Sequence, residues 1–499
     1  MLKKIQNACH KYKDNNAFFI NGTYYTYLTF AQHISNVRHI IEQNHQADSS
    51  KLIGVITYND IHTYASILGV LFSGYGFVPI NPENPIDRNE SIITQSGIGI
   101  ILTSTNYPDL NKLNNIAPLK IINTAQIEDS KIDVNIPDIG EDEIAYLLFT
   151  SGSTGIPKGV PISRRNLHSF IDAFFALGYK VDETDKFLQM FDLTFDLSLM
   201  SYLTPLCIGA CVYTIPSGEI KYTSIYSLLE DQNITVALMV PSILSYLRPY
   251  FEDIRLPNLK YSLFCGEALF NDITSEWFPC VPNALIQNVY GPTEATIFCL
   301  TYDWNKDIAT EKSFNGIVCI GKPMNNMYSI IVDEHLKELS AGEKGEMCLS
   351  GGQLTPGYWS NPEKNKKTFF KYNFNGVERT FYKTGDLCFI DQDGDFMFCG
   401  RIDHQVKIQG FRVELSEIEH HVRVFTELSQ VAAIATTDVI GNTQIILFIE
   451  KFTGNIDKLS NYLKEKLPSY MIPAEIKHIA VMPLNANGKI DRNALKKSL

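Results

Sequence analysis

The sequence lacks a C-x-x-C pair, a long uninterrupted apolar run and an excess of basic residues. Its ten cysteines are scattered, with only Cys207 and Cys211 close together, so we expect buried, reduced thiols and neither a disulfide framework nor a metal site. The run nearest to a membrane span, "ASILGVLFSGYGFVPINP", is broken by glycines and prolines. The N-terminal "MLKKIQNACHKYKDNNAFFI" has no apolar core or cleavage site of a signal peptide. We therefore expect a cytoplasmic protein without membrane insertion.

The charge balance argues against nucleic acid as a partner. The 499 residues carry a net charge of -12, whereas nucleic acids and anionic membranes reward clustered lysine and arginine. With 45% hydrophobic and 20% charged residues, the composition is that of a soluble globular protein. Chemistry on small molecules is the class of function that fits best.

Alternating apolar strands and helical patterns predict an α/β fold. Residues 52 to 80 read "LIGVITYNDIHTYASILGVLFSGYGFVPI", and similar alternation returns at "ALMVPSILSYLRPY" and "YSLFCGEALF". We expect parallel-rich sheets with covering helices up to about residue 300. From Tyr328 short alternating runs and tight turns predict antiparallel hairpins or a small β-barrel-like layer of the same large domain. The acidic stretch "DQDGD" at 391 to 395 fails the EF-hand spacing and is interpreted as a hairpin turn.

The pattern restarts near Asp403. Helix "LSEIEHHVRVF", strands "QVAAIATTDV" and "TQIILFIEK", helix "IDKLSNYLKEKL" and a closing "EIKHIAVM" predict a compact α+β unit. We expect a large N-terminal domain over residues 1 to 402 and a small C-terminal domain over residues 403 to 499.

A glycine-rich loop, "FTSGSTGIPKGV" at 149 to 160, is the first candidate binding element. Backbone N-H groups in such turns form concave anion sites, to which hydroxyl groups and the charge of Lys158 would add donors. The loop matches neither the Walker motif nor the dinucleotide fingerprint. Taken alone, a flexible surface linker is an equally good interpretation.

Further motifs follow this loop in a fixed order. They are "NVYGPTEAT" at 288 to 296, "GEMCLSGGQLTPGYWSNPEK" at 345 to 364, "FYKTGDL" at 381 to 387, "GRIDHQVKIQGFRVELSEIE" at 400 to 419 and "NANGKIDR" at 485 to 492. Together with "SGSTGIPKGV" they resemble the adenylate-forming superfamily, which includes acyl-CoA synthetases, luciferases and the adenylation domains of nonribosomal peptide synthesis. The resemblance covers nearly the whole chain and implies ATP and Mg²⁺ as cofactors.

The resemblance also assigns roles to single residues in nucleotide binding. Forming an acyl adenylate places negative charge on several oxygens at once, which fixed donors and cations offset. The resemblance implies that Tyr290 and Gly291 contact adenine and that Asp386 and Arg401 contact the ribose. It implies that Thr293 contacts the α-phosphate and that Glu294 binds Mg²⁺. The groups implied for the β and γ phosphates are those of Thr150, Ser151, Gly152, Ser153, Thr154, Gly155 and Lys158.

Three positions near the C-terminus imply a moving domain. In the family the lysine matching Lys489 bridges the substrate carboxylate and the α-phosphate, although a lysine in such a turn is usually just solvated. Asp403 matches the hinge about which the small domain rotates between half-reactions. Gly410 matches the glycine that keeps a thiol tunnel open.

The substrate is expected to be a small amino acid. "FDLTFDLSLM" at 191 to 200 holds two F-D-x-[ST] copies, and Asp196 of the second matches the aspartate that pairs with the α-ammonium group in amino-acid-activating members. A capping or surface aspartate is the alternative. "FDLSLM" and "FCGEAL" are similar to the corresponding stretches of D-alanine:D-alanyl carrier protein ligases. The implied pocket wall consists of Leu197, Met200, Leu263, Cys265, Val289 and Ile297, with Cys265 acting sterically.

The expected activity is therefore ligation of D-alanine, through its adenylate, to a phosphopantetheine thiol. Because the sequence ends seven residues after Arg492, we expect the carrier protein to be a separate molecule. A stand-alone adenylation enzyme for another amino acid is the nearest alternative. An acyl-CoA synthetase, which Asp196 disfavours, and an inactive nucleotide-binding relative are the others.

Overall fold

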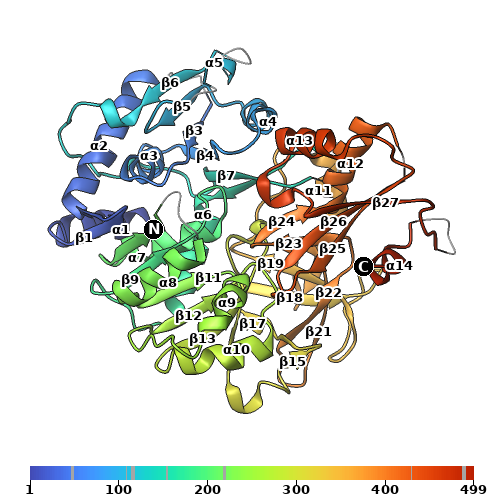
Figure 1. Cartoon of the computed structure of the whole chain (residues 1–499). Coiled ribbons are helices and arrows are strands. Elements are labelled where there is room, and N and C mark those ends of the chain that lie inside the picture. The colour runs from blue at the N-terminus through green and yellow to red at the C-terminus, as the bar shows by residue number, and fades with distance from the viewer. Residues whose placement is uncertain are drawn as a thin grey trace. The chain divides into compact units, whose positions relative to one another are not determined.

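The structure is a computed structural model that describes residues 1–45, 50–107, 110–113, 118–152, 155–216, 221–428, 430–485 and 490–499 (Figure 1). The chain divides into two compact units. Unit 1 comprises Met1–Pro82, Ile93–Leu148 and Gly159–Ile402, and unit 2 comprises Glu83–Ile92, Phe149–Lys158 and Asp403–Leu499. Two short segments from the first 402 residues thus group with the C-terminal segment.

The largest sheet of unit 1 has nine strands in the order β17-β14-β13-β12-β11-β9-β10-β1-β2. The pairs between β13 and β1 along this order are parallel, and both edges are antiparallel. Its parallel strands are short apolar runs, because helices cover both faces of such a sheet. The bounds are β1 (Asn16–Ile20), β2 (Thr23–Thr26), β9 (Lys186–Gln189), β10 (Cys211–Thr214), β11 (Val236–Met239), β12 (Tyr261–Phe264), β13 (Leu285–Tyr290), β14 (Leu300–Asp303) and β17 (Lys322–Pro323).

A second sheet has six strands in the order β6-β5-β3-β4-β7-β8. Its strands are β3 (Leu52–Ile56), β4 (Gly76–Ile80), β5 (Ile100–Thr103), β6 (Lys120–Asn123), β7 (Ile144–Thr150) and β8 (Lys158–Ser163). The helices before residue 370 are α1 (Leu2–Lys11), α2 (Tyr27–Asn44), α3 (Ile61–Phe72), α4 (Ile86–Ser96), α5 (Leu110–Leu113), α6 (Arg164–Ala176), α7 (Leu197–Leu206), α8 (Lys221–Asp231), α9 (Ser242–Leu247), α10 (Asn271–Trp277) and α11 (Pro362–Thr368). The predicted α/β class is confirmed.

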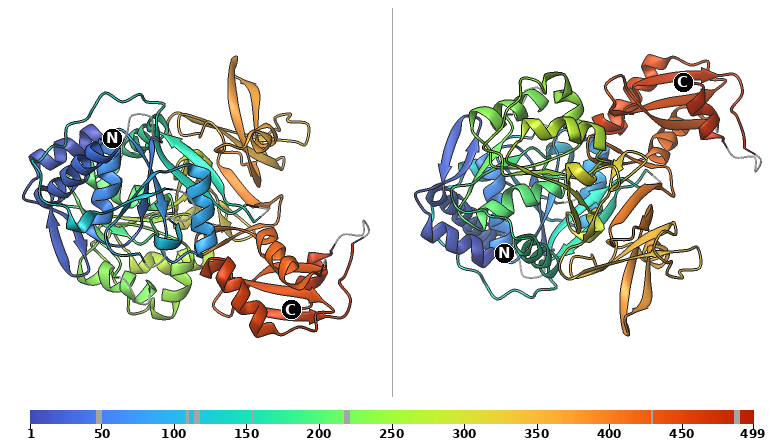
Figure 2. Two further views of the ribbon diagram at one scale, coloured as in Figure 1. Left: turned by 90° about the horizontal axis from the view of Figure 1, so that it is seen from above. Right: turned by 90° about the horizontal axis from the view of Figure 1, so that it is seen from below.

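The segment after Tyr328 forms a five-stranded antiparallel sheet. Its strands are β18 (Met327–Val332), β19 (Gly345–Gly351), β20 (Phe369–Phe374), β21 (Val377–Ile390) and β22 (Phe396–Arg401). The β20-β21 hairpin is the long orange ribbon of Figure 2. The hairpin alternative is therefore right. In the described residues β21 pairs with three neighbours, and the pairings do not include closure into a barrel.

Unit 2 contains the predicted α+β pattern. A three-stranded sheet, β25-β26-β27, and a two-stranded one, β23-β24, enclose an apolar cluster with two helices. Each predicted helix and strand is present to within a few residues. The bounds are β23 (Gln405–Ile408), β24 (Phe411–Glu414), α12 (Leu415–Thr426), β25 (Val431–Thr437), β26 (Thr443–Glu450), α13 (Ile456–Lys466), β27 (Glu475–Ile479) and α14 (Arg492–Lys497).

Two further expectations concern thiols and membranes. All ten cysteines are free, and nine are buried, as the sequence predicted. Among the described helices, none combines the length and apolar character needed to cross a bilayer.

Candidate active site

The predicted site residues divide between the two units. Ser153, Thr154 and Lys489 lie outside the described residues. The remaining phosphate-loop positions, with Asp403 and Gly410, belong to unit 2. The residues assigned to adenine, ribose, α-phosphate, Mg²⁺ and amino acid belong to unit 1.

Asp386 is the centre of a polar cluster in unit 1. It pairs across the β21-β22 ladder with Arg401, whose Nη1 donates to Asp386 Oδ1 at 2.7 Å and to the Thr384 carbonyl at 2.9 Å. The Tyr290 hydroxyl, at the carboxyl end of β13, donates to Asp386 Oδ2. Burial, and then the charge of Asp386, raises the pKa of Tyr290, so the phenol remains a donor. The structure thus brings together three of the residues assigned to adenine and ribose.

Asp386 keeps the capacity to bind a diol. A carboxylate has about four acceptor positions, so two donors on different oxygens leave room for two more. The surrounding donors fix the plane of the carboxylate, which a ligand with two adjacent hydroxyl groups requires.

Glu294 is fully buried in a single 3-10 turn, Thr293–Ala295. The Tyr358 hydroxyl donates to Glu294 Oε1 at 2.6 Å, and the Thr355 N-H donates to the Glu294 carbonyl at 2.8 Å. Gly291 precedes this turn, and a Cβ there would lie 2.4 Å from Phe298 Cα, so only glycine fits. The motif comparison assigned no role to Tyr358, although it lies inside the quoted 345 to 364 motif.

The two F-D-x-[ST] copies differ in their surroundings. Asp192 Oδ1 accepts from the Thr194 N-H at 2.8 Å and hydroxyl at 2.7 Å, and its Oδ2 accepts from Asn81. Asp192 therefore stabilises a local turn. Asp196 is only 3% exposed and stands at the N-cap of α7, where its side chain makes no capping bond. The surface and capping interpretations of Asp196 do not describe what is seen.

The six residues assigned to the pocket wall all belong to the main apolar core of unit 1, which contains many other residues as well. They derive from α7, from the ends of β12 and β13, and from the turn that follows residue 295. The Cys265 N-H donates to the Met239 carbonyl at 3.0 Å, which continues the β11-β12 pairing past the end of β12. Burial, and then Cys265, raises the pKa of Cys299, so these two thiols are neighbours. Leu197, Met200, Leu263, Cys265, Val289 and Ile297 are each at most 2% exposed.

In unit 2 the glycine-rich loop is folded around its own backbone. The Gly155 N-H donates to the Gly152 carbonyl at 3.0 Å, and Gly155 has a φ of 80°. A Cβ on Gly152 would lie 1.9 Å from the Ile156 carbonyl oxygen. Both glycines are therefore required by the backbone, which argues against a simple linker.

The donors of this loop contact acidic and carbonyl oxygens of the same unit. The Gly152 N-H donates to Glu417 Oε2 at 3.2 Å, and Lys158 Nζ lies 3.4 Å from Glu414 Oε1. The Ser151 hydroxyl donates to the Arg412 carbonyl at 2.7 Å. A loop that binds carboxylates through N-H and ammonium groups has the chemistry expected of a phosphate site.

Glu417 is held among these contacts by Arg88, whose Nη1 lies 3.0 Å from its Oε1. Burial raises the pKa of Glu417, and the Arg88 charge only partly offsets that rise.

The positions assigned to the hinge and the tunnel also belong to unit 2. Asp403 Oδ1 accepts from the Gln405 N-H at 3.1 Å. Gln409 and Gly410 have φ values of 50° and 84°, so they form the tight turn between β23 and β24 that twisted hairpins favour. The next residue, Phe411, stacks on Tyr470 with ring centroids 4.0 Å apart.

Comparison with known proteins places the chain among enzymes. The family model described as AMP-binding enzyme matches residues 5–359. Zwittermicin A synthase ZmaJ of Bacillus cereus is 33% identical over 457 residues, which cover 89% of this chain and 85% of that protein. A linear gramicidin synthase polypeptide of Brevibacillus parabrevis is 31% identical over 94% of this chain, but the match spans only 9% of that much longer protein.

The fold agrees with this similarity. The Vibrio cholerae adenylation domain AlmE, solved with glycyl-adenosine-5'-phosphate, superposes with a TM-score of 0.86 at 25% identity and covers 99% of this chain and 97% of its own. PA1221, a protein with adenylation and PCP domains, also has a TM-score of 0.86, at 23% identity, over 100% of this chain and 84% of its own. The matched family model, the ZmaJ similarity and the shared fold together show that the chain belongs to the AMP-binding enzymes, the adenylate-forming superfamily.

Proposed function

We propose that the enzyme activates a small amino acid, D-alanine, with ATP and transfers it to the phosphopantetheine thiol of a separate carrier protein. The first step joins the amino-acid carboxylate to the α-phosphorus of ATP and releases pyrophosphate. The observation that carries this proposal is the buried carboxylate of Asp196 at the start of α7, directly before Leu197 of the apolar core. A carboxylate in such a position is suited to pair with a cation, which the α-ammonium group of an amino acid supplies.

The nucleotide part rests on the Asp386 cluster and the glycine-rich loop. Asp386 is proposed to accept both ribose hydroxyls, and Tyr290 with Gly291 to contact the adenine. The loop from Thr150 to Lys158 is proposed to hold the terminal phosphates, in place of the carboxylates that its donors contact here.

The metal part rests on Glu294. Mg²⁺ is usually bound by one or two carboxylates together with substrate phosphates, and a rigidly held carboxylate suits that use. The Tyr358 hydroxyl fixes the orientation of Glu294, and Thr293 is proposed to donate to the α-phosphate. Bound Mg²⁺ would neutralise charge on the phosphate oxygens.

The choice of a small side chain rests on the wall residues. Met200 and Cys265 are proposed to close the pocket around a methyl group, since bulky neighbours exclude larger side chains. The AlmE structure holds a glycyl adenylate, and glycine is the smallest amino acid. An acyl-CoA synthetase is disfavoured, because a fatty or aromatic acid would bring no cation to Asp196.

Transfer to the thiol rests on unit 2. Lys489 is proposed to act in the first half-reaction, and rotation about Asp403 to exchange it for the β23-β24 turn, where Gly410 leaves room for the phosphopantetheine arm. The free cysteines fit the reducing cytoplasm as the place of action.

Amino-acid-dependent exchange of pyrophosphate into ATP tests the proposal directly. A panel would include glycine, both alanine enantiomers, 2-aminobutyrate, valine and a fatty acid. We expect D-alanine to give the highest kcat/KM. Selection of another amino acid would replace D-alanine as substrate, and exchange with the fatty acid alone would exclude the amino-acid class.

A further inference from the structure

We propose that Gln353 is a positioning residue, which holds the turn at residues 295–298 in the conformation that the site needs. The turn follows Glu294 and carries Ile297, so it connects the proposed metal ligand to the proposed pocket wall. The inference rests on the proposed function for the roles of these two residues. The contacts of Gln353 itself are independent of it.

The turn has an unusual backbone. Thr296 and Ile297 have φ values of 56° and 74°, in the left-handed region that β-branched residues avoid. Both side chains are at most 1% exposed, so packing leaves them little room to adjust. Such a conformation persists only where the surroundings enforce it, and it is found preferentially at functional sites.

The side chain of Gln353 supplies that constraint. It is fully buried, and its amide nitrogen lies 3.2 Å, 3.2 Å and 2.9 Å from the carbonyl oxygens of Ala295, Thr296 and Phe298, which share its two N-H groups. Three carbonyl oxygens around one end of the amide determine which end is the nitrogen, because an oxygen there would be repelled. In the reverse direction, the Thr296 hydroxyl donates to the Gln353 backbone carbonyl.

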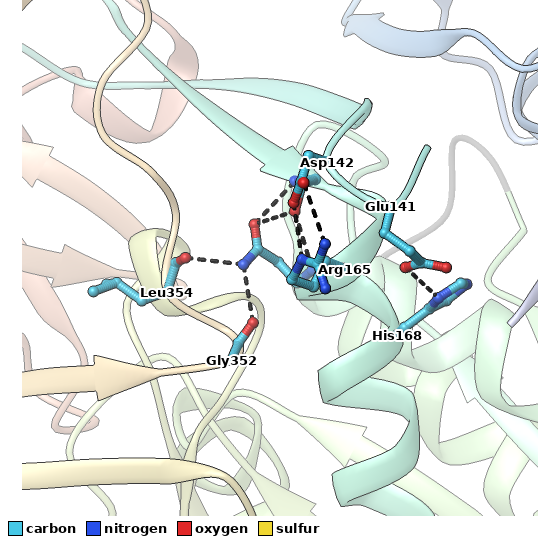
Figure 3. Close-up of polar contacts among 8 residues, drawn as sticks. Glu141, Asp142, Arg165, His168, Gly352 and Leu354 are labelled. Carbon is cyan, nitrogen blue, oxygen red and sulfur yellow. Dashed lines mark hydrogen bonds and ion pairs between the residues drawn. The ribbon is translucent and has the colours of Figure 1, made fainter. Parts of the chain in front are cut away.

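Gln353 is itself fixed from the other side. The Asn166 amide donates at 2.9 Å to both the Gly352 and the Leu354 carbonyls, which flank Gln353. Figure 3 labels Gly352 and Leu354 and marks the hydrogen bonds to their carbonyls with dashed lines. Asn166 is the third residue of α6 and forms a capping box with Ser163. The next residue after this cap, Arg164, donates to the Leu71 and Tyr75 carbonyls, so the start of α6 is anchored in the core.

The segment that contains Gln353 also holds Glu294. Thr355 bonds the Glu294 backbone and Tyr358 bonds its carboxylate, as described above. Phe298, at the far end of the turn, packs against Gly291. Release of the turn would therefore displace Ile297 and loosen the motif at Gly291 and Glu294. A change at Gln353 should alter substrate selection as well as stability.

The test compares wild type with Gln353→Glu, which keeps the shape of the side chain but replaces the donor by an acceptor. Pyrophosphate exchange is measured with D-alanine and with 2-aminobutyrate, and the midpoint of thermal unfolding is recorded. We expect the KM for D-alanine to rise about tenfold or more, and the preference over 2-aminobutyrate to fall, because Ile297 is no longer held.

Asn36→Asp is the matched control. Asn36 is a buried amide of unit 1 that donates to Asp129 at 2.9 Å and accepts from the Ser130 N-H at 2.9 Å, with no part in the site. The Asn36→Asp variant should have a lower midpoint of thermal unfolding, with an unchanged KM for D-alanine and unchanged selectivity over 2-aminobutyrate. If Gln353→Glu behaves like Asn36→Asp, the positioning role is refuted.

Two further outcomes remain decisive. If Gln353→Glu does not fold, Thr296→Val removes only the hydroxyl bond to the Gln353 carbonyl and should shift selectivity in the same direction; unchanged selectivity refutes the proposal. If wild type exchanges pyrophosphate only with an acid that is not an amino acid, the proposed function fails. The variants are then compared with that acid and a close homologue, so that Gln353 is judged separately.

Discussion

The two aspartates of "FDLTFDLSLM" show how position decides the use of a carboxylate. Asp192 accepts hydrogen bonds from Thr194 and Asn81, which is a structural task that an asparagine oxygen could largely take over. Asp196 lies in the core at the start of α7, where a charged carboxylate is costly unless a cation pairs with it. Substitution of each residue should therefore have a different consequence.

Asp196→Asn should lower kcat/KM for the amino acid by about a hundredfold or more, because the α-ammonium group loses its charged partner. The loss should appear mainly in KM for the amino acid, measured by pyrophosphate exchange, and KM for ATP should stay the same. Asp192→Asn serves as the control and should change neither constant strongly. If the Asp192 substitution lowers kcat/KM more than the Asp196 substitution, Asp192 of the first copy of the motif is the partner of the ammonium group.

At the scale of elements, the turn between β21 and β22 binds a lysine from an earlier part of the chain. Lys312 Nζ lies 2.7 Å from Asp391, 2.7 Å from Asp393 and 2.6 Å from Asp395, and its side chain is only 9% exposed. The ammonium group takes the place that a metal ion could hold among three carboxylates. This explains why "DQDGD" forms a stable turn, as the sequence predicted, without the ligand spacing of a calcium loop.

Lys312→Met should lower the free energy of unfolding by about 3–5 kcal/mol, because it leaves partly buried carboxylates without their cation. Burial would raise the pKa of Asp391, but the hydrogen bond and charge of Lys312, together with the N-H groups of Asp395 and Asp393, outweigh it, and the net shift is downward. A lowered pKa contributes stability above the unfolded value near 4, and this contribution disappears as pH falls through the folded value. Denaturant titrations from pH 7 to pH 3 should therefore show the two proteins converging in acid; a constant difference would contradict this account.

The β23-β24 turn is the element proposed to face the thiol. Gly410→Ala places a Cβ at a φ of 84°, which costs about 1 kcal/mol, and narrows the proposed tunnel. We expect pyrophosphate exchange to stay near wild type while loading of a carrier thiol falls about tenfold. Gly441→Ala is a matched control, because this glycine has a φ of 90° in another turn of the same unit and should leave both half-reactions intact. If Gly410→Ala slows both half-reactions equally, the β23-β24 turn has no specific role in transfer to the thiol.

At the scale of the whole molecule, local sequence patterns predicted the helices and strands, but they did not predict how distant strands pair. Apolar runs such as "ALMV" became buried parallel strands, and the helices and strands after Asp403 lie where periodicity predicted them. The order of the nine-stranded sheet was beyond reach, because β1 pairs with β10 from a distant part of the chain. Alternation predicts antiparallel strands but carries no information about closure, so the sequence could not decide between hairpins and a barrel-like layer.

In the candidate site too, the sequence predicted some residues, while others were recognised only from contacts between distant parts of the chain. Tyr290, Asp386 and Arg401 were predicted from motifs, and the structure brings them together. Gln353 and Tyr358 lie inside a quoted motif but received no role, because their partners are carbonyls and a carboxylate remote in sequence. Residue type and spacing identify groups that meet a ligand, whereas residues that hold those groups become visible only with the fold.

The two half-reactions should depend differently on Lys489. If the ammonium of Lys489 offsets charge on both reacting anions only during adenylation, Lys489→Ala should slow pyrophosphate exchange by about 10²–10³-fold. Thiol loading from a supplied D-alanyl adenylate should remain close to wild type, because that step is proposed to use the β23-β24 turn instead. Lys496→Ala, an exposed lysine of α14, controls for loss of surface charge. Equal loss in both assays would mean that Lys489 does not alternate with the turn, and that a single arrangement of the enzyme serves both steps.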